Sequence, residues 1–170
     1  MALVKLNLGC GKNIRVGWIN LDRTSYPGVD VICDVDTERL PFEDQTLTYI
    51  CASHVLEHCW RWEAVVLECY RVLHPGGMLE VRVPFKKNMG AYHVRFFDSS
   101  SMDAFIQGSD RFLSLEPKLD FILVGQEYTR HFPLKWHLAH YLGIRIPNSI
   151  PIGSRKEIVW YLEKPTERPT

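Results

Sequence analysis

Short apolar runs, separated by glycine, proline and polar residues, recur through the first half of the chain. They cover residues 4–8, 18–21, 29–33, 47–52 and 78–83. Runs of this length with many branched side chains are typical of strands that are buried on both faces of a parallel sheet. We therefore expect a strand at each run, joined to the next by a connection that crosses the sheet.

A helical pattern lies between the fourth and fifth runs. Apolar residues recur three and four positions apart at 66, 69, 70 and 73, and Pro75-Gly76-Gly77 is expected to end the helix. Strand, helix and strand in this order predict a parallel crossover.

Beyond residue 85 the pattern predicts two more strands and two more helices. The strands are expected at 121–124 and 158–162. One helix is expected near Ser100, with Asp103 completing a capping box, and the other from Pro133 to Gly143. Together with the earlier runs, these elements predict an α/β fold, a doubly wound and mostly parallel sheet of seven strands.

The first connection is unusually short. Only nine residues separate Leu8 from Trp18, whereas a parallel crossover normally needs roughly a dozen or more. We expect the first crossover helix to be truncated to about one turn or replaced by a loop.

Composition narrows the class of protein. The 170 residues suit one domain, and 20 basic side chains balance 20 acidic ones, which disfavours a nucleic-acid partner. The five cysteines are odd in number and lack a Cys-x-x-Cys pair, so we expect buried thiols in a reducing compartment. No apolar run approaches the ~20 residues of a membrane span, and we expect no signal peptide. These features predict a cytoplasmic protein without a membrane partner.

The first run leads directly into a glycine turn. Gly9-Cys10-Gly11 follows it, and the second run ends in Asp22, thirteen residues after Gly9. Glycines let a ligand approach the backbone closely, and an acid that closes the neighbouring strand is placed to bind a ribose diol. The third glycine of a dinucleotide site is missing, since Ile14 stands there. The pattern favours recognition of a nucleoside.

Five motifs, in order, resemble those of the class I S-adenosylmethionine-dependent methyltransferases. They are the segment 6–11, Asp22, the segment 33–42 with Leu40-Pro41-Phe42, Ser53-His54-Val55-Leu56-Glu57-His58, and Leu73-His74-Pro75-Gly76-Gly77-Met78-Leu79. The resemblance implies the family's Rossmann-like fold with an antiparallel pair of last strands. It also implies S-adenosyl-L-methionine as the cofactor and methyl transfer as the activity.

The same resemblance implies roles for individual residues. The glycine turn would contact the methionine end of the cofactor, Asp22 would contact the ribose, and an acid after the third strand would contact the adenine amino group. Ser53 and His54 would face the transferable methyl group. The implied cofactor-binding residues are Leu8, Gly9, Cys10, Gly11, Asp22, Asp34, Val35, Asp36, Ser53 and His54.

Two acids compete for the adenine contact. Asp34 stands directly at the strand end, where ligands of open sheets bind. Asp36 has the spacing to Leu40-Pro41-Phe42 that is commoner in the family. The strand-end position slightly favours Asp34, and the other acid would then be a solvated turn residue.

Three histidines, His54, His93 and His131, are candidate bases or substrate contacts. Histidine titrates near neutral pH, and a base assists methyl transfer to a hydroxyl group. His93 and His131 lie in two aromatic and basic segments, 92–97 and 128–132. These segments either converge on one ligand or supply core aromatics and solvated arginines. We predict a small or carbohydrate-like acceptor.

Two other functions compete with methyl transfer. His54-x-x-Glu57-His58 matches the inverted zinc-peptidase signature, which makes a zinc-dependent hydrolase a distant alternative. That motif belongs inside a helix, and we expect no metal site. The short first crossover supports a second alternative, a non-catalytic nucleoside-binding or scaffold protein. It also suggests a homodimer in which the partner covers the cofactor side.

The preferred interpretation treats residues 1–170 as a single methyltransferase-like domain. Residues 1–85 would form the cofactor-binding half, 86–164 the substrate wall and the last strands, and 165–170 a tail.

Overall fold

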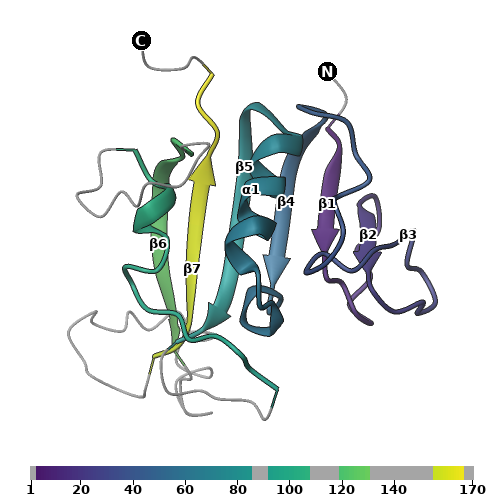
Figure 1. Ribbon diagram of the computed structural model, residues 1–170, viewed down its shortest axis with the longest axis horizontal. Helices are drawn as coiled ribbons and strands as arrows, with labels where there is room; N and C mark the ends of the chain where they lie inside the picture. The colour runs from purple at the N-terminus through teal and green to yellow at the C-terminus, as the bar shows by residue number, and fades with distance from the viewer. Residues whose placement is uncertain (1–2, 86–91, 108–118, 131–154, 167–170) are drawn as a thin grey trace, which may run out of the picture.

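The computed structural model describes residues 3–85, 92–107, 119–130 and 155–166. Seven strands in this part of the chain form one sheet (Figure 1). They are β1 (Lys5–Leu8), β2 (Ile19–Asp22), β3 (Val31–Ile32), β4 (Leu47–Ser53), β5 (Leu73–Pro84), β6 (Ile122–Arg130) and β7 (Arg155–Glu163). Their order across the sheet is β3-β2-β1-β4-β5-β7-β6.

The strand directions agree with the predicted fold class. The first five strands pair in parallel, and β7 runs antiparallel to both β5 and β6. The strand order reverses between β1 and β4, as in a doubly wound sheet. The predicted α/β fold with seven mostly parallel strands is confirmed, and each predicted apolar run contains a strand.

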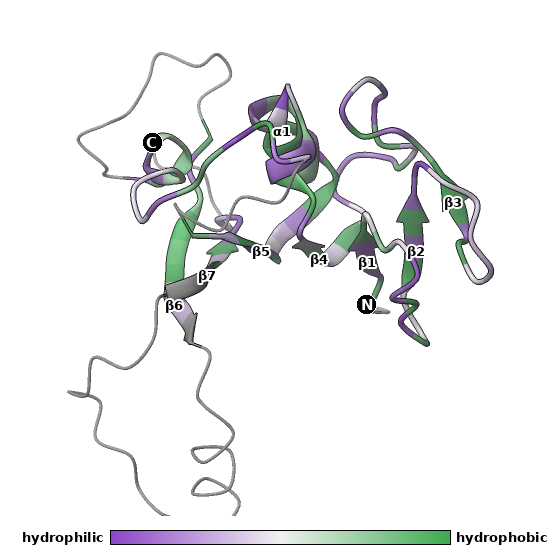
Figure 2. Cartoon of the chain, turned by 90° about the horizontal axis from the view of Figure 1, so that it is seen from below, coloured by the Kyte–Doolittle hydropathy of each residue, from purple (hydrophilic) through white to green (hydrophobic). Residues whose placement is uncertain are grey.

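A single α-helix occurs in the described part of the chain, α1 (Trp62–Val72). It lies on one face of the sheet, in front of β4 and β5 (Figures 1 and 2). Val65, Val66 and Cys69 on its inner side are buried in one core with alternate strand side chains such as Leu6. The amphipathic pattern of the sequence is therefore realised, because this face of the helix has the sheet to pack against.

The end of α1 differs from the prediction. The helix stops at Val72 and β5 begins at Leu73, the last residue of the helical pattern, so Pro75-Gly76-Gly77 lies within a strand that has already begun. Pro75 disfavours helical backbone at the residue before it. Gly77 is required at its position because a Cβ there would lie 2.7 Å from the carbonyl oxygen of His74.

The connection from β1 to β2 is a loop, as the short spacing predicts. Residues 9–18 are all described and contain no helix. Two buried asparagines hold this loop from adjacent strands. Asn7 Nδ2 donates hydrogen bonds to the Asn13 carbonyl at 2.8 Å and to Asn20 Oδ1 at 3.0 Å. Asn20 Nδ2 in turn donates to the Arg15 carbonyl at 3.1 Å.

The opposite face of the sheet carries a polar network. Glu80 is 6% exposed, and its carboxylate accepts hydrogen bonds from the Tyr49 hydroxyl at 2.6 Å and from Arg82 Nε. Glu80 alternates along β5 with the core residues Leu79 and Val81. The network therefore connects β4 to β5 from the side away from α1.

The two other predicted helices have different outcomes. Near Ser100 only a short 3₁₀ turn forms, η2 (Asp103–Phe105), and it has no side-chain cap. The capping box is wrong because Ser100 donates both its backbone N–H and its hydroxyl to Asp98 Oδ1. The helix predicted from Pro133 to Gly143 lies outside the described residues. Among the helices that are described, none has the length and apolarity needed to cross a membrane.

Candidate functional site

A cavity of about 340 Å³ lies at the carboxyl ends of β1, β2, β3 and β4. Ligands of open α/β sheets bind at this edge, beside the point where the strand order reverses, and the volume is in the range of small-molecule sites. The wall is formed by Gly9, Gly11, Leu21, Asp22, Arg23, Thr24, Tyr26, Cys33, Asp34, Val35, Asp36, His54, Val55, His58, Cys59 and Tyr92.

Most of the predicted cofactor-binding residues lie on this wall. Those on the wall are Gly9, Gly11, Asp22, Asp34, Val35, Asp36 and His54. Leu8, Cys10 and Ser53 do not line the cavity. Leu8 and Cys10 are buried, and the Cys10 backbone N–H donates to the Leu21 carbonyl at 2.9 Å. These residues belong to the framework beneath the cavity.

The glycine turn closes one side of the cavity with bare backbone. Gly9 has φ +61°, and a Cβ there would lie 2.4 Å from Val55 Cγ2. Gly11 has φ +52°, with no described atom within 4 Å of where its Cβ would stand. Gly9 is therefore required for packing and backbone conformation, and Gly11 leaves space for a ligand against the backbone.

Asp22 is held at the end of β2 by two backbone donors. The Gly11 N–H donates to Asp22 Oδ2 at 2.8 Å, and the Thr24 N–H donates to Oδ1 at 2.9 Å. An ionised carboxylate accepts about four hydrogen bonds, so acceptor capacity is left for a ligand. The carboxylate is thus oriented before any ligand arrives.

The two candidate adenine contacts, Asp34 and Asp36, differ in the hydrogen bonds that their carboxylates accept. Asp36 accepts the Arg61 N–H on Oδ1 at 2.7 Å and the Trp60 N–H on Oδ2 at 3.0 Å. Asp34 Oδ1 accepts only the nearby Asp36 N–H, at 3.1 Å, among the described contacts of its carboxylate. Asp36 therefore anchors the chain that enters α1, and it is not the solvated turn residue that the alternative assumed.

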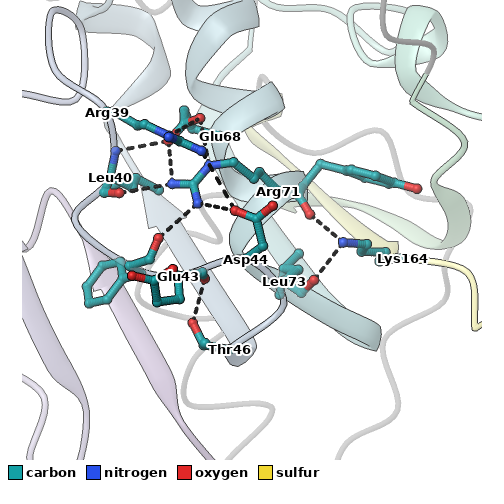
Figure 3. Close-up of polar contacts among 11 residues, drawn as sticks. Arg39, Leu40, Glu43, Asp44, Thr46, Glu68, Arg71, Leu73 and Lys164 are labelled. Atoms are coloured by element: carbon teal, nitrogen blue, oxygen red, sulfur yellow. Dashed lines mark hydrogen bonds and ion pairs between the residues drawn. The ribbon is translucent and has the colours of Figure 1, made fainter.

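Arg71 of α1 anchors the segment that follows these acids (Figure 3). Its guanidinium donates to the Leu40 and Phe42 carbonyls, both at 2.9 Å. It also binds Glu68 through two nitrogens, at 2.9 and 2.8 Å, and Asp44 Oδ1 at 2.7 Å. The Leu40-Pro41-Phe42 motif is therefore tied to the helix by its backbone oxygens.

His54 directly follows β4 and has an unusual backbone for a non-glycine residue, with φ +57°. Its Nδ1 lies 3.1 Å from Glu57 Oε1, and its Nε2 lies 3.2 Å from Glu157 Oε1. The hydrogen bond with Glu57, opposed by burial and reinforced by the charge of Glu157, raises the pKa of His54. Both ring nitrogens are therefore engaged by carboxylates.

The other two candidate histidines lie elsewhere. His93 does not line the cavity, but its ring centroid is 5.0 Å from that of His58, which does. His131 lies outside the described residues. In the segment 92–97, Tyr92 lines the cavity and Phe97 is buried in the core beside Trp62. Residues 131 and 132 of the other segment lie outside the described residues, so convergence of the two segments on one ligand stays a prediction.

The cysteines behave as the sequence predicts, as free and buried thiols. Cys33 and Cys59 lie on the cavity wall. Burial, reinforced by the charge of Asp36, raises the pKa of Cys59 to about 12. A thiol with this pKa stays protonated near neutral pH and is a poor nucleophile.

The zinc-peptidase signature does not form its own kind of site. His54 directly follows β4, and His58 is the last residue of a 3₁₀ turn, η1 (Leu56–His58). The motif instead requires both histidines on one α-helix. His54 is also not part of the cluster of possible metal ligands in the described chain, which consists of Glu57, His58 and His93.

Several wall residues were not predicted from the sequence. Arg23, Thr24 and Tyr26 follow Asp22, and Cys59 follows the motif Ser53 to His58, of which Val55 and His58 also line the cavity. Their position just beyond a strand end was the available signal, since loops at that edge form the ligand crevice. Tyr92 was not named individually, but it belongs to the segment 92–97, one of the two segments that the sequence offered as able to converge on a ligand.

Comparison of the sequence with known proteins finds similarity to methyltransferases. Residues 6–81 match the family model of a methyltransferase domain. A probable S-adenosylmethionine-dependent methyltransferase of Mycolicibacterium smegmatis is 39% identical over 62 residues, which are 36% of this chain and 24% of the relative. A malonyl-[acyl-carrier protein] O-methyltransferase of Methylococcus capsulatus is 31% identical over 98 residues, with 50% of this chain and 36% of the relative covered. The chain thus spans about a quarter to a third of these relatives' lengths.

Solved structures extend the similarity to the whole sheet. A SAM-dependent methyltransferase from Archaeoglobus fulgidus has a TM-score of 0.62 at 13% identity, covering 96% of this chain and 86% of that chain. A putative methyltransferase from Bacillus halodurans has a TM-score of 0.60 at 15% identity, covering 95% and 92%. At these identities the similarity concerns the fold. The predicted resemblance is confirmed, in fold across the sheet and in sequence over residues 6–81.

Proposed function

We propose that this chain, whose fold and residues 6–81 are those of a class I methyltransferase domain, transfers a methyl group from S-adenosylmethionine to a small acceptor. The observation that carries the proposal is the placement of Asp22. Its carboxylate lies on the cavity wall at the end of β2, oriented by the N–H groups of Gly11 and Thr24. A carboxylate held in this way is suited to accept hydrogen bonds from the two hydroxyls of a ribose.

The glycine turn fits the methionine end of the cofactor. A Cβ at position 11 would occupy space that is open beside Gly11. Because glycine has no Cβ, a ligand can approach the backbone there. Gly9 lies next to it on the same wall. The turn and Asp22 would therefore hold neighbouring parts of one elongated ligand.

Asp34 is the acid that we assign to the adenine amino group. Each oxygen of Asp36 already accepts a backbone N–H at the entry to α1, so the Asp36 carboxylate has less acceptor capacity left than that of Asp34. Asp34 uses one oxygen in its own turn, which leaves the other to accept from the amino group. Substituting each acid with alanine tests the assignment: Asp34→Ala should weaken cofactor binding, and Asp36→Ala should mainly lower stability.

Catalysis would rest on alignment and exclusion of water. When bound, S-adenosylmethionine supplies an electrophilic methyl group, and little covalent chemistry is left to the protein. His54 and Val55 stand on the wall just beyond β4, near where the resemblance places that methyl group. Because Glu57 and Glu157 engage both ring nitrogens of His54, we assign it to substrate positioning instead of proton abstraction.

The acceptor that we propose is a small or carbohydrate-like molecule. The cavity of about 340 Å³ has the size of a small-molecule site, and His58 and Tyr92 on its wall come from the segments that we propose contact the acceptor. Balanced charge over the whole sequence supports a neutral or weakly charged acceptor over a polyanion.

Calorimetric titration with S-adenosylhomocysteine, the demethylated cofactor, tests the proposal. The wild-type chain should bind it at a single site, and Asp22→Asn should weaken binding by about 10- to 150-fold, corresponding to ~1.5–3 kcal/mol for a charge-assisted hydrogen bond. Glu43→Ala, on an exposed turn, is the matched control and should leave the affinity unchanged. Failure of the wild-type chain to bind at millimolar ligand would contradict the proposal.

A methyl-transfer assay with radiolabelled cofactor against a panel of small hydroxyl and amine acceptors tests turnover. Binding without turnover on any acceptor would favour the non-catalytic nucleoside-binding alternative. The predicted homodimer remains a prediction, which sedimentation with and without the demethylated cofactor would test.

A further inference from the structure

Three side chains of the kind that bind metal ions converge beside the cavity. They are Glu57 and His58 of η1 and His93, which comes from beyond β5, and their ligand atoms all lie within 4.8 Å of one another. His58 lines the cavity wall. The cluster therefore lies at the edge of the proposed methyl-transfer site, and none of the roles assigned above uses it.

Glu57 provides an oxygen that the fold leaves without a partner. Its side chain is 1% exposed, and Oε1 is engaged by His54 Nδ1 at 3.1 Å. Oε2 is buried and has no hydrogen-bond partner among the described residues. A buried carboxylate oxygen is costly to leave unpaired, and a bound cation would satisfy it.

His58 is oriented as a metal-binding histidine usually is. Its Nδ1 lies 3.1 Å from the Tyr92 carbonyl oxygen. A carbonyl oxygen only accepts, so this contact requires the proton on Nδ1 and leaves Nε2 as the ring nitrogen that can bind a metal ion. This tautomer, set by a backbone carbonyl on the far side of the ring, is the one that metal-ligating histidines commonly adopt.

His93 is delivered to the cluster by backbone contacts that hold its segment on η1. The Val94 and Arg95 N–H groups both donate to the Glu57 carbonyl, at 2.8 and 3.2 Å. Arg95 Nη2 also donates to the Trp60 carbonyl at 2.7 Å. With the residues on both sides fixed, the His93 ring lies at 77° to the His58 ring.

We propose that Glu57, His58 and His93 bind a divalent transition-metal ion, with Zn²⁺ as the best match to two imidazoles and one carboxylate. Tetrahedral ligands at ~2.1 Å from zinc lie about 3.4 Å apart, so small side-chain rotations bring these atoms into range. Three protein ligands leave a coordination position open. Because His58 lines the cavity, we assign that position to an acceptor oxygen, a use that rests on the proposed function.

The contact between His54 and Glu57 orients the carboxylate of the proposed cluster. A carboxylate ligand is normally held by a hydrogen bond on its other oxygen, and His54 provides that bond to Glu57. Two of the three proposed ligands, Glu57 and His58, belong to the zinc-peptidase pattern in the sequence. The first histidine of that pattern, His54, forms a hydrogen bond with Glu57 and is not a ligand, and the third ligand is His93.

Metal titration of the tag-free, chelator-treated chain tests the site. Co²⁺ should give visible absorption bands that saturate at one equivalent, and Zn²⁺ should displace it. Glu57→Gln and His93→Asn should each weaken Zn²⁺ affinity by about tenfold or more. His74→Asn, at the amino end of β5 and away from the cavity, is the matched control and should leave the affinity unchanged.

Binding of S-adenosylhomocysteine, measured on the same samples, reports whether each variant is folded and separates this proposal from the previous one. Loss of Zn²⁺ binding with retained binding of S-adenosylhomocysteine in either variant would support the metal site. A wild-type chain that takes up no stoichiometric Zn²⁺ in excess metal, or variants with wild-type Zn²⁺ affinity, would overturn it. A chain that binds Zn²⁺ but not S-adenosylhomocysteine would contradict only the proposed function.

Discussion

Asn7 on β1 donates a side-chain hydrogen bond of 3.0 Å to Asn20 on β2, and the two residues are register partners across the parallel pair. Through the same side chains they bind backbone groups of the loop at Asn13 and Arg15. The two buried side-chain amides therefore hold a connection that contains no crossover helix. They do so because they form hydrogen bonds with the loop's backbone groups and fix the turn that begins at Gly9.

Replacing Asn20 with alanine should destabilise the protein. The Asn7 amide would lose one of its two acceptors and the Arg15 N–H would lose its side-chain acceptor, which is expected to lower the free energy of unfolding by about 2–4 kcal/mol. Urea denaturation measures the change. Asn13→Ala is the control, because Asn13 contributes only its backbone carbonyl and its side chain is exposed; a similar loss there would contradict the assignment.

Replacing Gly9 with alanine should cost stability for two separable reasons. A positive φ is unfavourable for alanine by about 1–2 kcal/mol, and the new Cβ would meet Val55 at 2.4 Å, which adds about 1–3 kcal/mol of overpacking. Gly17→Ala has a similar φ of +76° and open space around its Cβ, so it should show only the first effect.

A double-mutant cycle isolates the contact between residues 9 and 55. The combined Gly9→Ala and Val55→Ala variant should be more stable than the sum of the two single changes implies, by about 1–3 kcal/mol. Strict additivity in thermal or urea unfolding would show that the close approach of Gly9 to Val55 is unimportant.

Replacing Arg71 with lysine should destabilise the wall that carries Asp34 and Asp36. Lysine cannot reproduce the fork that binds two carbonyls and two carboxylates, and we expect a loss of about 2–3 kcal/mol with weaker binding of S-adenosylhomocysteine. Arg39→Lys is the matched control. Arg39 is 68% exposed and lies 3.7 Å from the same acids, so its change should stay within about 0.5 kcal/mol.

Acid sensitivity should depend on Glu80. Burial alone would raise the pKa of Glu80, but the hydrogen bonds from Tyr49 and Arg82 outweigh it and leave the pKa lowered. A carboxyl group whose folded-state pKa is depressed contributes stability above its unfolded-state value, near 4.5, and loses that contribution as the pH falls through the folded-state pKa.

The free energy of unfolding should therefore decline below that pH more steeply in the wild type than in Glu80→Gln. Chemical denaturation over a series of acidic buffers gives both slopes. Glu43→Gln, on an exposed turn, should follow the wild-type slope. Parallel curves for the wild type and Glu80→Gln would mean that the network of Tyr49, Glu80 and Arg82 does not favour the ionised form.

Local features of the amino-acid sequence account for most of the secondary structure. Apolar runs of strand length located all seven strands, the helical spacing around Cys69 located α1, and the nine-residue gap after Leu8 indicated a loop. The glycine turn and Asp22 were predicted as a pair because both follow strand ends. Parallel strands bring those ends to one edge, so their proximity follows from the order of the elements.

Contacts between segments that are distant in the sequence could be seen only in the folded chain. Asp36 accepts the Trp60 and Arg61 N–H groups, which the sequence does not connect to it, and the proposed preference for Asp34 rests on these contacts. The capping box near Ser100 failed because Asp98 competes for the serine. Glu57 acquires His93 as a neighbour only when the segment after β5 folds back onto η1. Local spacing specifies backbone conformation, whereas buried polar contacts form between groups that folding brings together, and periodicity carries no signal for them.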